Sequence, residues 1–322
     1  MADSSLLPSL RLDSLPGVSP NPHRMPLSSL TRLAGLLLAA LLTAHPAAQA
    51  AVDATMRCAP SAQGIPARPA AAPGGRAFAG SVAGYSEPQR EAAIRHELLA
   101  GNLPRFLREL QPTTLVARLA DGRPVQLTLC VLSDYLSIGS DDDFLRVPMG
   151  LDSALAVAGR FGFTLPTRRI VDLIYRQAAV HLSPQPLPPG NTMRSTATYL
   201  QHQDLVAQQQ ALQHAPAGAL TAGHKKDLVL SPRLWTEPGR VAIYGWHRSA
   251  AAPIQPLSTV HGAGYADYSH GVRLVGRTVW LDGVPKSIFD LLADPLLAPL
   301  LSDEGPLPRA AALISAADAP PR

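Results

Sequence analysis

The sequence predicts an α+β protein with a single main domain, in which a mixed or antiparallel sheet carries helices packed on one side. Two observations predict this class. Strand patterns lie next to one another along the chain instead of alternating regularly with helices. The 322 residues are 46% apolar, which is enough to bury a substantial core. We therefore expect one globular unit, over residues 85–305.

The first 50 residues are predicted to be an upstream extension followed by a secretory signal peptide. Two arginines lead into a leucine- and alanine-rich run, and Ala48–Ala50 supplies the small residues of a signal-peptidase site, so we expect cleavage before Ala51. Met1 and Met25 both remain candidate start sites. No other stretch reaches the roughly twenty apolar residues of a membrane span. We expect a periplasmic or secreted protein with no stable span after cleavage.

Cys58 and Cys130 are the only cysteines in the chain. An even number in an oxidising compartment favours a disulfide between them. The alternative is a catalytic thiol at Cys130. It is disfavoured because residues 125–132 form an apolar strand pattern, where burial would raise the pKa of the thiol and leave it unreactive.

Three segments stand apart from the expected core by composition. Residues 51–84 are rich in alanine, proline and glycine and are predicted to be a loosely ordered linker that contributes little to the core. Residues 190–222 are polar and glutamine-rich, which is typical of a lid or an insertion. Residues 306–322 are expected to form a disordered tail.

Local signals place the first elements of the globular unit. Ser86 and Gln89 form a capping-box pattern around Pro88, which predicts a helix that ends near Gly101. A short helix is expected at 103–110. Residues 114–119 and 125–132 alternate as strands do and are joined through a turn at Asp121-Gly122, which predicts a β-hairpin.

Apolar spacing of three and four residues predicts further helices, and period-two alternation predicts the strands that follow. The helices are expected at 152–160, 166–181, 202–213, 287–292 and 294–301. The strands are expected at 227–230, 240–245, 271–275 and 278–281, with the last two forming a hairpin through Gly276-Arg277.

The charge pattern argues against a nucleic-acid partner. The net charge is +4, and there is neither a run of Lys and Arg nor the interleaved aromatic residues expected of a nucleic-acid groove. The acidic run at 141–143 lacks the alternation of a calcium loop and is interpreted as a solvated loop. Asp134 and Arg146 lie on either side of that run. They can reach the histidines of residues 223–273 only if the fold brings the two segments to one edge.

The segment from Gly223 to Arg273 is the strongest candidate for a functional site, because four of the ten histidines fall within it. Imidazole is the side chain best suited to proton transfer or metal binding near neutral pH. The segment also carries aspartates and aromatic residues at predicted strand ends, where a fold commonly presents reactive groups. A purely structural hydrogen-bond network is the alternative interpretation of the same residues.

In the metal-free interpretation, a carboxylate orients an imidazole, which moves a proton. The residues assigned to catalysis are His247, His270, Asp267 and Tyr268. Those assigned to substrate binding are Lys226, Tyr244, Trp246, His261, Tyr265 and Arg273. In the metal interpretation, a divalent ion such as zinc is held by His224 and Asp227 with other members of the segment, although their spacing matches no known ligand motif.

Several blocks resemble an uncharacterised family of exported bacterial proteins. They include GHKKD from Gly223, YGWH from Tyr244 and DYSHGVRL from Asp267, and the resemblance spans residues 90–305. It implies export and one domain, and no activity. The block from Asp267 is also similar to the Asp-Cys-Ser-Gly block of papain-like cell-wall peptidases. Tyr268 replaces that cysteine, and a phenol cannot act as the acyl acceptor.

Two functions follow as hypotheses. The first is an exported bacterial hydrolase that acts on a cell-envelope or extracellular polymer through the His/Asp/Tyr cluster. The alternative is a non-catalytic periplasmic binding or envelope-organising protein with an aromatic-lined groove. Both take a cell-envelope polymer or a small ligand as the partner.

Overall fold

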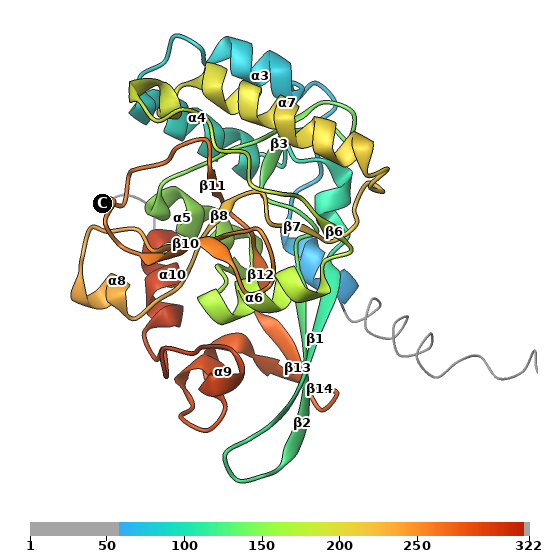
Figure 1. Cartoon of the computed structure of the whole chain (residues 1–322), viewed down its shortest axis with the longest axis vertical. Coiled ribbons are helices and arrows are strands. Elements are labelled where there is room, and N and C mark those ends of the chain that lie inside the picture. The colour runs from blue at the N-terminus through green and yellow to red at the C-terminus, as the bar shows by residue number, and fades with distance from the viewer. Residues whose placement is uncertain (1–57, 319–322) are drawn as a thin grey trace, which may run out of the picture. The chain divides into compact units, whose positions relative to one another are not determined.

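Strands of the chain form two larger sheets, with helices packed around them (Figure 1). The computed structural model describes residues 58–318, so the predicted extension, signal peptide and cleavage site lie outside the described residues. The fold is α+β with mixed and antiparallel sheets, as predicted. Within residues 58–318, no helix is both long enough and apolar enough to cross a membrane.

The six-stranded sheet contains the predicted β-hairpin. Its order is β14-β13-β2-β12-β5, with β1 also paired to β2. β1 and β2 are antiparallel, from the pair Gln111 and Val131 to the pair Arg118 and Pro124, so the prediction at residues 114–132 is confirmed. The strands of this sheet are β1 (Gln111–Arg118), β2 (Pro124–Val131), β5 (Phe163–Thr164), β12 (Val275–Gly276), β13 (Thr278–Leu281) and β14 (Val284–Ser287).

The predicted hairpin through Gly276-Arg277 is wrong. β12 and β13 both pair with β2, through Val275 and Trp280, so they are consecutive parts of one strand path and not partners. β13 instead pairs with β14. The turn between them places Asp282 at φ 51° and Gly283 at φ 79°. Two consecutive positive φ values are what a tight two-residue hairpin requires, so the Asp-Gly pair was the informative signal.

The four-stranded sheet, of order β10-β9-β8-β11, carries the candidate site. β8 runs antiparallel to β9 and parallel to β11. Its strands are β8 (Lys226–Leu228), β9 (Ile243–His247), β10 (Pro253–Ser258) and β11 (His270–Gly271). Two small pairs complete the strands: β3 (Ser137–Gly139) with β4 (Phe144–Arg146), and β6 (Val180–His181) with β7 (Thr221–Ala222).

Most predicted helices are present, with shifted ends. Ser86 and Gln89 form the expected capping box at the start of α4. The segment predicted as a helix at 103–110 is only a short 3-10 turn. The helices are α4 (Glu87–Leu99), α5 (Leu151–Phe161), α6 (Arg168–Gln177), α7 (Thr196–Leu212), α8 (Arg233–Thr236) and α9 (Ile288–Ala293), with 3-10 turns η2 (Arg105–Arg108), η3 (Asn191–Arg194) and η4 (Ala298–Leu300).

The segments interpreted as linker and tail pack onto the core where the structure describes them. Residues before α4 form η1 (Ala59–Gly64) and α3 (Gly75–Ser81), and Phe78 is 3% exposed. A Cβ at Gly75 would lie 2.4 Å from the backbone nitrogen of Leu145, so this glycine permits close packing of two backbones. At the other end, α10 (Ala310–Asp318) packs on α5 and buries Ile314.

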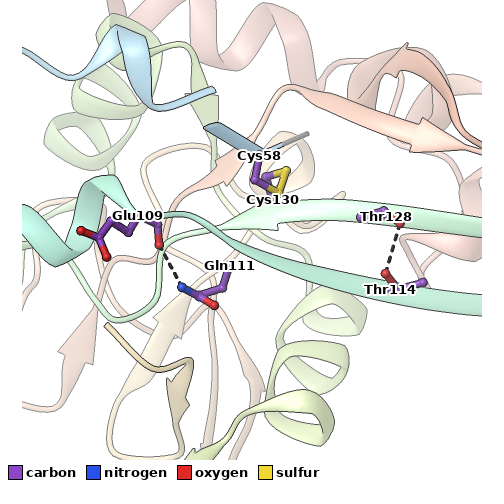
Figure 2. Close-up of a disulfide and its surroundings, with 6 residues drawn as sticks. All are labelled: Cys58, Glu109, Gln111, Thr114, Thr128 and Cys130. Atoms are coloured by element: carbon purple, nitrogen blue, oxygen red, sulfur yellow. Dashed lines mark hydrogen bonds between the residues drawn. A yellow bond between two sulfur atoms is a disulfide. The ribbon is translucent and has the colours of Figure 1, made fainter. Parts of the chain in front are cut away.

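The predicted disulfide between Cys58 and Cys130 is present and ties the start of η1 to β2 (Figure 2). The two Cα atoms are 5.3 Å apart. Beside it, the hydroxyls of Thr114 and Thr128 form a hydrogen bond of 3.1 Å across the β1–β2 pair (Figure 2). Because Cys130 is bonded to Cys58, it is not a free nucleophile.

Candidate functional site

The four-stranded sheet brings the three histidine-containing blocks side by side. Lys226 on β8 pairs with Gly245 on β9 and with His270 on β11. The side chains nevertheless divide into three groups that face different parts of the molecule. We call them the surface cluster, the α6 group and the buried charge network, and define each below.

The surface cluster consists of His261, Tyr265, Asp267, His270 and Lys226. His261 is half-buried and stacks on Tyr265, with ring centroids 4.0 Å apart and planes within 8°. The ring of His270 lies 6.1 Å from that of His261 and 5.6 Å from that of Tyr265. The Tyr265 hydroxyl donates a hydrogen bond of 3.0 Å to Asp267 Oδ2. Two imidazoles, a phenol and a carboxylate therefore meet at one place.

His270 is the most unusual member of the surface cluster. Its ring is fully buried, yet neither ring nitrogen has a hydrogen-bond partner within the described residues. Burial lowers the pKa of His270 to about 4 and also lowers the pKa of His261. Both rings are therefore neutral near pH 7, the state in which an imidazole accepts a proton.

Charged groups complete the surface cluster. Burial alone would raise the pKa of Asp267, but the nearby His270 and the hydrogen bonds from Ser269 lower it below its ordinary value. Burial lowers the pKa of Lys226, whose Nζ lies 4.9 Å from the centre of the Trp246 ring. An ionised carboxylate is thus held directly beside neutral bases.

The strand β9 is irregular at Gly245, the residue that pairs with Lys226, and at Trp246. Gly245 has φ 111° and Trp246 has φ 57°, although both lie inside the strand. A bulky residue at positive φ is an outlier that the surrounding structure must hold in place. The irregularity interrupts the alternation of side chains along β9.

The α6 group is formed by His247, Tyr244, Asp172 and Tyr175. Nε2 of His247 lies 3.0 Å from Asp172 Oδ1, and the Tyr244 hydroxyl donates a 2.8 Å hydrogen bond to the same oxygen. Tyr175 stacks on the His247 ring at 4.7 Å. Asp172 was not among the predicted site residues, and its signal in the sequence was a single carboxylate among the apolar residues of a predicted helix.

Asp227 lies next to the α6 group. It accepts a 2.8 Å hydrogen bond from the Tyr135 hydroxyl at Oδ2, while Oδ1 has no partner within residues 58–318. Burial raises the pKa of Asp227 to about 6. The Tyr135 ring lies against Gly271, where an added Cβ would stand 2.5 Å from Cδ1 of the tyrosine. Gly271 is therefore required for Tyr135 to reach Asp227.

The buried charge network is centred on Asp134. The fold brings this residue to His224, as the sequence allowed. Its carboxylate accepts hydrogen bonds from Arg146 Nη2 at 2.6 Å and from the Tyr135 backbone at 2.7 Å, and it lies 3.1 Å from His224 Nε2. Burial alone would raise the pKa of Asp134, but Arg146 and His224 hold it well below its usual range. Burial lowers the pKa of His224 to about 4.

Two further cations of the network are fully buried. Arg273 donates to the backbone oxygens of Leu132 and Thr221, and its guanidinium carbon lies 4.4 Å from the Tyr135 ring centre. Lys225 donates to the backbone oxygen of Tyr268, and burial lowers the pKa of Lys225 to about 7. Both groups therefore lie in the interior and donate to backbone carbonyl oxygens there.

Several predicted roles change with these positions. Arg273 is 1% exposed and bound to backbone carbonyls, so it is not placed to hold a substrate at the surface. Tyr268 is also 1% exposed, and its hydroxyl accepts a hydrogen bond from the Leu187 backbone. Tyr244 and Trp246 are each 7% exposed. Of the aromatic residues predicted to line a groove, Tyr265 alone is more than marginally exposed.

The predicted metal ligands do not converge. His224 faces Asp134, whereas Asp227 faces Tyr135. Within residues 58–318, no group of three or more His, Cys, Asp or Glu side chains is arranged to hold a metal ion. The two residues lack a third ligand because they belong to different hydrogen-bonded groups.

Known proteins provide no guide to the function of this site. Comparison with protein-family models, with curated proteins and with solved structures finds no match for this chain. The function is therefore inferred from the residues of the site.

Proposed function

We propose that this protein is an exported bacterial hydrolase that acts on a cell-envelope or extracellular polymer at the surface cluster. The observation that carries the proposal is the stacked His261–Tyr265 pair above the buried His270, beside the carboxylate of Asp267. The signal segment, the family resemblance and the disulfide, which suits an oxidising compartment, support export.

Each member of the surface cluster has a role in the proposed mechanism. His261, at the surface, takes a proton from a water molecule as the water oxygen bonds to the electrophilic carbon of the substrate. The same imidazolium returns the proton to the leaving group when the scissile bond breaks. Lys226 offsets negative charge on the oxygen of the intermediate.

The remaining members position these groups. Asp267 holds Tyr265 through the phenol hydrogen bond, and Tyr265 holds the ring of His261 by stacking. Burial raises the pKa of Tyr265 to about 12, so the phenol stays protonated and keeps donating to Asp267. His270 lies beside both rings, with its centroid 6.1 Å from that of His261 and 5.6 Å from that of Tyr265.

Digestion of purified peptidoglycan tests the proposal. The mature protein with its disulfide intact is incubated with sacculi, and released fragments are identified by mass spectrometry. We expect fragments from the wild type, and a loss of about 100-fold or more in their rate of release for His261→Gln, the range typical of a removed acid–base group. His96→Gln is the matched control, because the His96 side chain is 80% exposed and lies on α4.

Two results would change the conclusion. Equal release by His261→Gln and the wild type would remove the surface cluster from the mechanism. Binding to sacculi without release of fragments would instead support the non-catalytic periplasmic or envelope-organising protein. Circular dichroism of each variant separates loss of chemistry from loss of folding.

A further inference from the structure

A cavity lies at the C-terminal end of α7, and none of the surface-cluster residues lines it. We propose that this α7 pocket binds a small organic ammonium ion with an apolar body. The pocket has a volume of about 390 Å³ and is lined by residues from α7, β4, the segment 214–219 and the segment that follows β2. The volume falls within the range of roughly 300–1,000 Å³ that is typical of small-molecule sites.

Two aromatic rings give the α7 pocket a surface that suits a cation. Phe106 and Phe144 pack edge to face, with centroids 5.1 Å apart and planes at 71°, and both line the cavity. The guanidinium carbon of Arg146 already lies 5.0 Å from the Phe144 ring centre. Aromatic ring faces attract cations through their quadrupole, and the attraction grows when the cation is desolvated.

The charged groups on the lining favour a positive ligand. Two carboxylates, Asp134 and Asp141, line the α7 pocket, and no Lys or Arg is among the described residues that do so. His214 is the other titratable side chain on the lining. An anion placed here would meet the carboxylate of Asp141, whereas an ammonium would meet that carboxylate and two aromatic rings.

The two carboxylates differ in what they can still accept. Asp134 receives two hydrogen bonds from Arg146 and one from the backbone of Tyr135, and it faces His224, so its acceptor positions are filled. Asp141 accepts one hydrogen bond, at Oδ1, from the Phe106 backbone. Its Oδ2 lies 3.7 Å from Arg105, an 81% exposed side chain that water screens. Asp141 is therefore the group that can bind the ammonium.

Gln210 offers a ligand a hydrogen-bond donor, whereas Asp141 offers an acceptor. Its Oε1 accepts a 2.9 Å hydrogen bond from Arg146 Nη2, which leaves the amide nitrogen as the part that can donate to a ligand. The ligand is thus an amine with an apolar body, and a hydrogen-bond acceptor near that body could be bound by the Gln210 amide. Since Gln210 contacts Arg146, an occupant of the α7 pocket would also touch the buried charge network.

Three probes of similar size and different charge test the proposal: 2-phenylethylamine, 2-phenylethanol and phenylacetate. Binding to the mature, disulfide-bonded protein is measured by isothermal titration calorimetry. We expect the amine to bind at least about tenfold more tightly than the alcohol or the carboxylate. Equal affinity for all three probes, or no binding of the amine, would overturn the proposal.

Matched variants locate the binding. Asp141→Asn is expected to weaken the binding of the amine by about tenfold. Asp142→Asn, at a neighbouring exposed position that does not line the pocket, is expected to leave the affinity unchanged. Ala211→Phe on α7 fills the pocket and should abolish binding. Ala207→Phe, one turn earlier on the same helix and outside the lining, is its control. Unchanged affinity in Ala211→Phe would place the amine elsewhere and refute the assignment. None of these outcomes depends on the hydrolase activity.

Discussion

His247 and Asp172 lie 75 positions apart in the chain and are joined across 3.0 Å, between the imidazole Nε2 and the carboxylate Oδ1. The contact links β9 to α6 and leaves the His247 ring stacked on Tyr175. His247 therefore contributes to the packing of α6 on the four-stranded sheet and lies outside the surface cluster. The proposed chemistry therefore depends on His261 and His270 and not on His247.

Replacing Asp172 by alanine should destabilise the fold. Asp172→Ala removes the acceptor shared by His247 and Tyr244, and leaving buried polar groups unpaired costs about 1–3 kcal/mol. Urea unfolding measures the change. Asp152→Ala, at an exposed acid on α5, is the control and should cost less than about 1 kcal/mol. Equal losses in the two variants would show that the contact with His247 contributes nothing.

The pair Asp134 and Arg146 should be far more important for stability than a surface ion pair. Asp134→Asn leaves Arg146 buried without its charge partner, which costs about 3–5 kcal/mol. The matched surface pair is Arg76 with Asp204, whose side chains are 63% and 54% exposed. Asp204→Asn should change the free energy of unfolding by less than about 1 kcal/mol. A small effect of Asp134→Asn would contradict a charged buried network.

Gly271→Ala should disturb the contact between Tyr135 and Asp227. The new Cβ would lie 2.5 Å from the tyrosine ring, and overpacking of this kind costs about 1–3 kcal/mol. Gly264→Ala meets nothing within 4 Å and serves as the control. Thermal unfolding of both variants measures the difference. Equal melting temperatures of the two variants would mean that Tyr135 moves aside without a loss of stability.

The stability of the protein should fall in acid partly because of His270. Below its ordinary pKa of 6.5 the unfolded chain takes up a proton at this ring, whereas the folded chain does so only near pH 4. Stability is therefore lost as the pH falls through this window, by about 1.4 kcal/mol per pH unit for one such group. His270→Gln should reduce that slope, as measured by urea unfolding at several pH values.

The control for this pH experiment is the exposed imidazole of His96. Its side chain is 80% exposed, so His96→Gln replaces an imidazole without opening a buried space. A His270→Gln slope equal to that of the wild type would show that the folded and unfolded chains take up this proton over the same pH range.

Reduction of the disulfide should destabilise the fold. The bridge spans a sequence separation of 72 residues, and the chain-entropy model predicts a loss of about 4 kcal/mol when such a loop is opened. Unfolding with and without reductant measures it. The double variant Cys58→Ala with Cys130→Ala should match the reduced wild type and should not respond to reductant. A response in that variant would point to an effect of the reductant itself.

Local signals predicted the elements that depend on neighbouring residues. The capping box at Ser86 and the turn at Asp121-Gly122 fix a helix start and a hairpin within a few positions, and both were predicted correctly. The disulfide followed from the number of cysteines. Glycine was ambiguous, because Gly75 permits close packing but was interpreted as part of a flexible linker.

The candidate site was predicted only in part, because its partners come from distant segments. The sequence located His261, Tyr265, Asp267 and His270 within one short stretch, and the structure brings them into contact. It could not reveal Asp172, since that contact requires α6 to pack on β9. The positive φ of Trp246 also interrupts the regular alternation of side chains along β9, which no local sequence signal predicts.

The composition of the buried charge network bears on how the chain could be divided. Arg146, Lys225 and Arg273 are buried with Asp134, and these residues are spread over 140 positions from the first to the last. A fragment that stopped before β11 would enclose carboxylates without Arg273. Truncation inside this span is thus expected to yield no independently folding fragment, because it would leave buried charges without their partners.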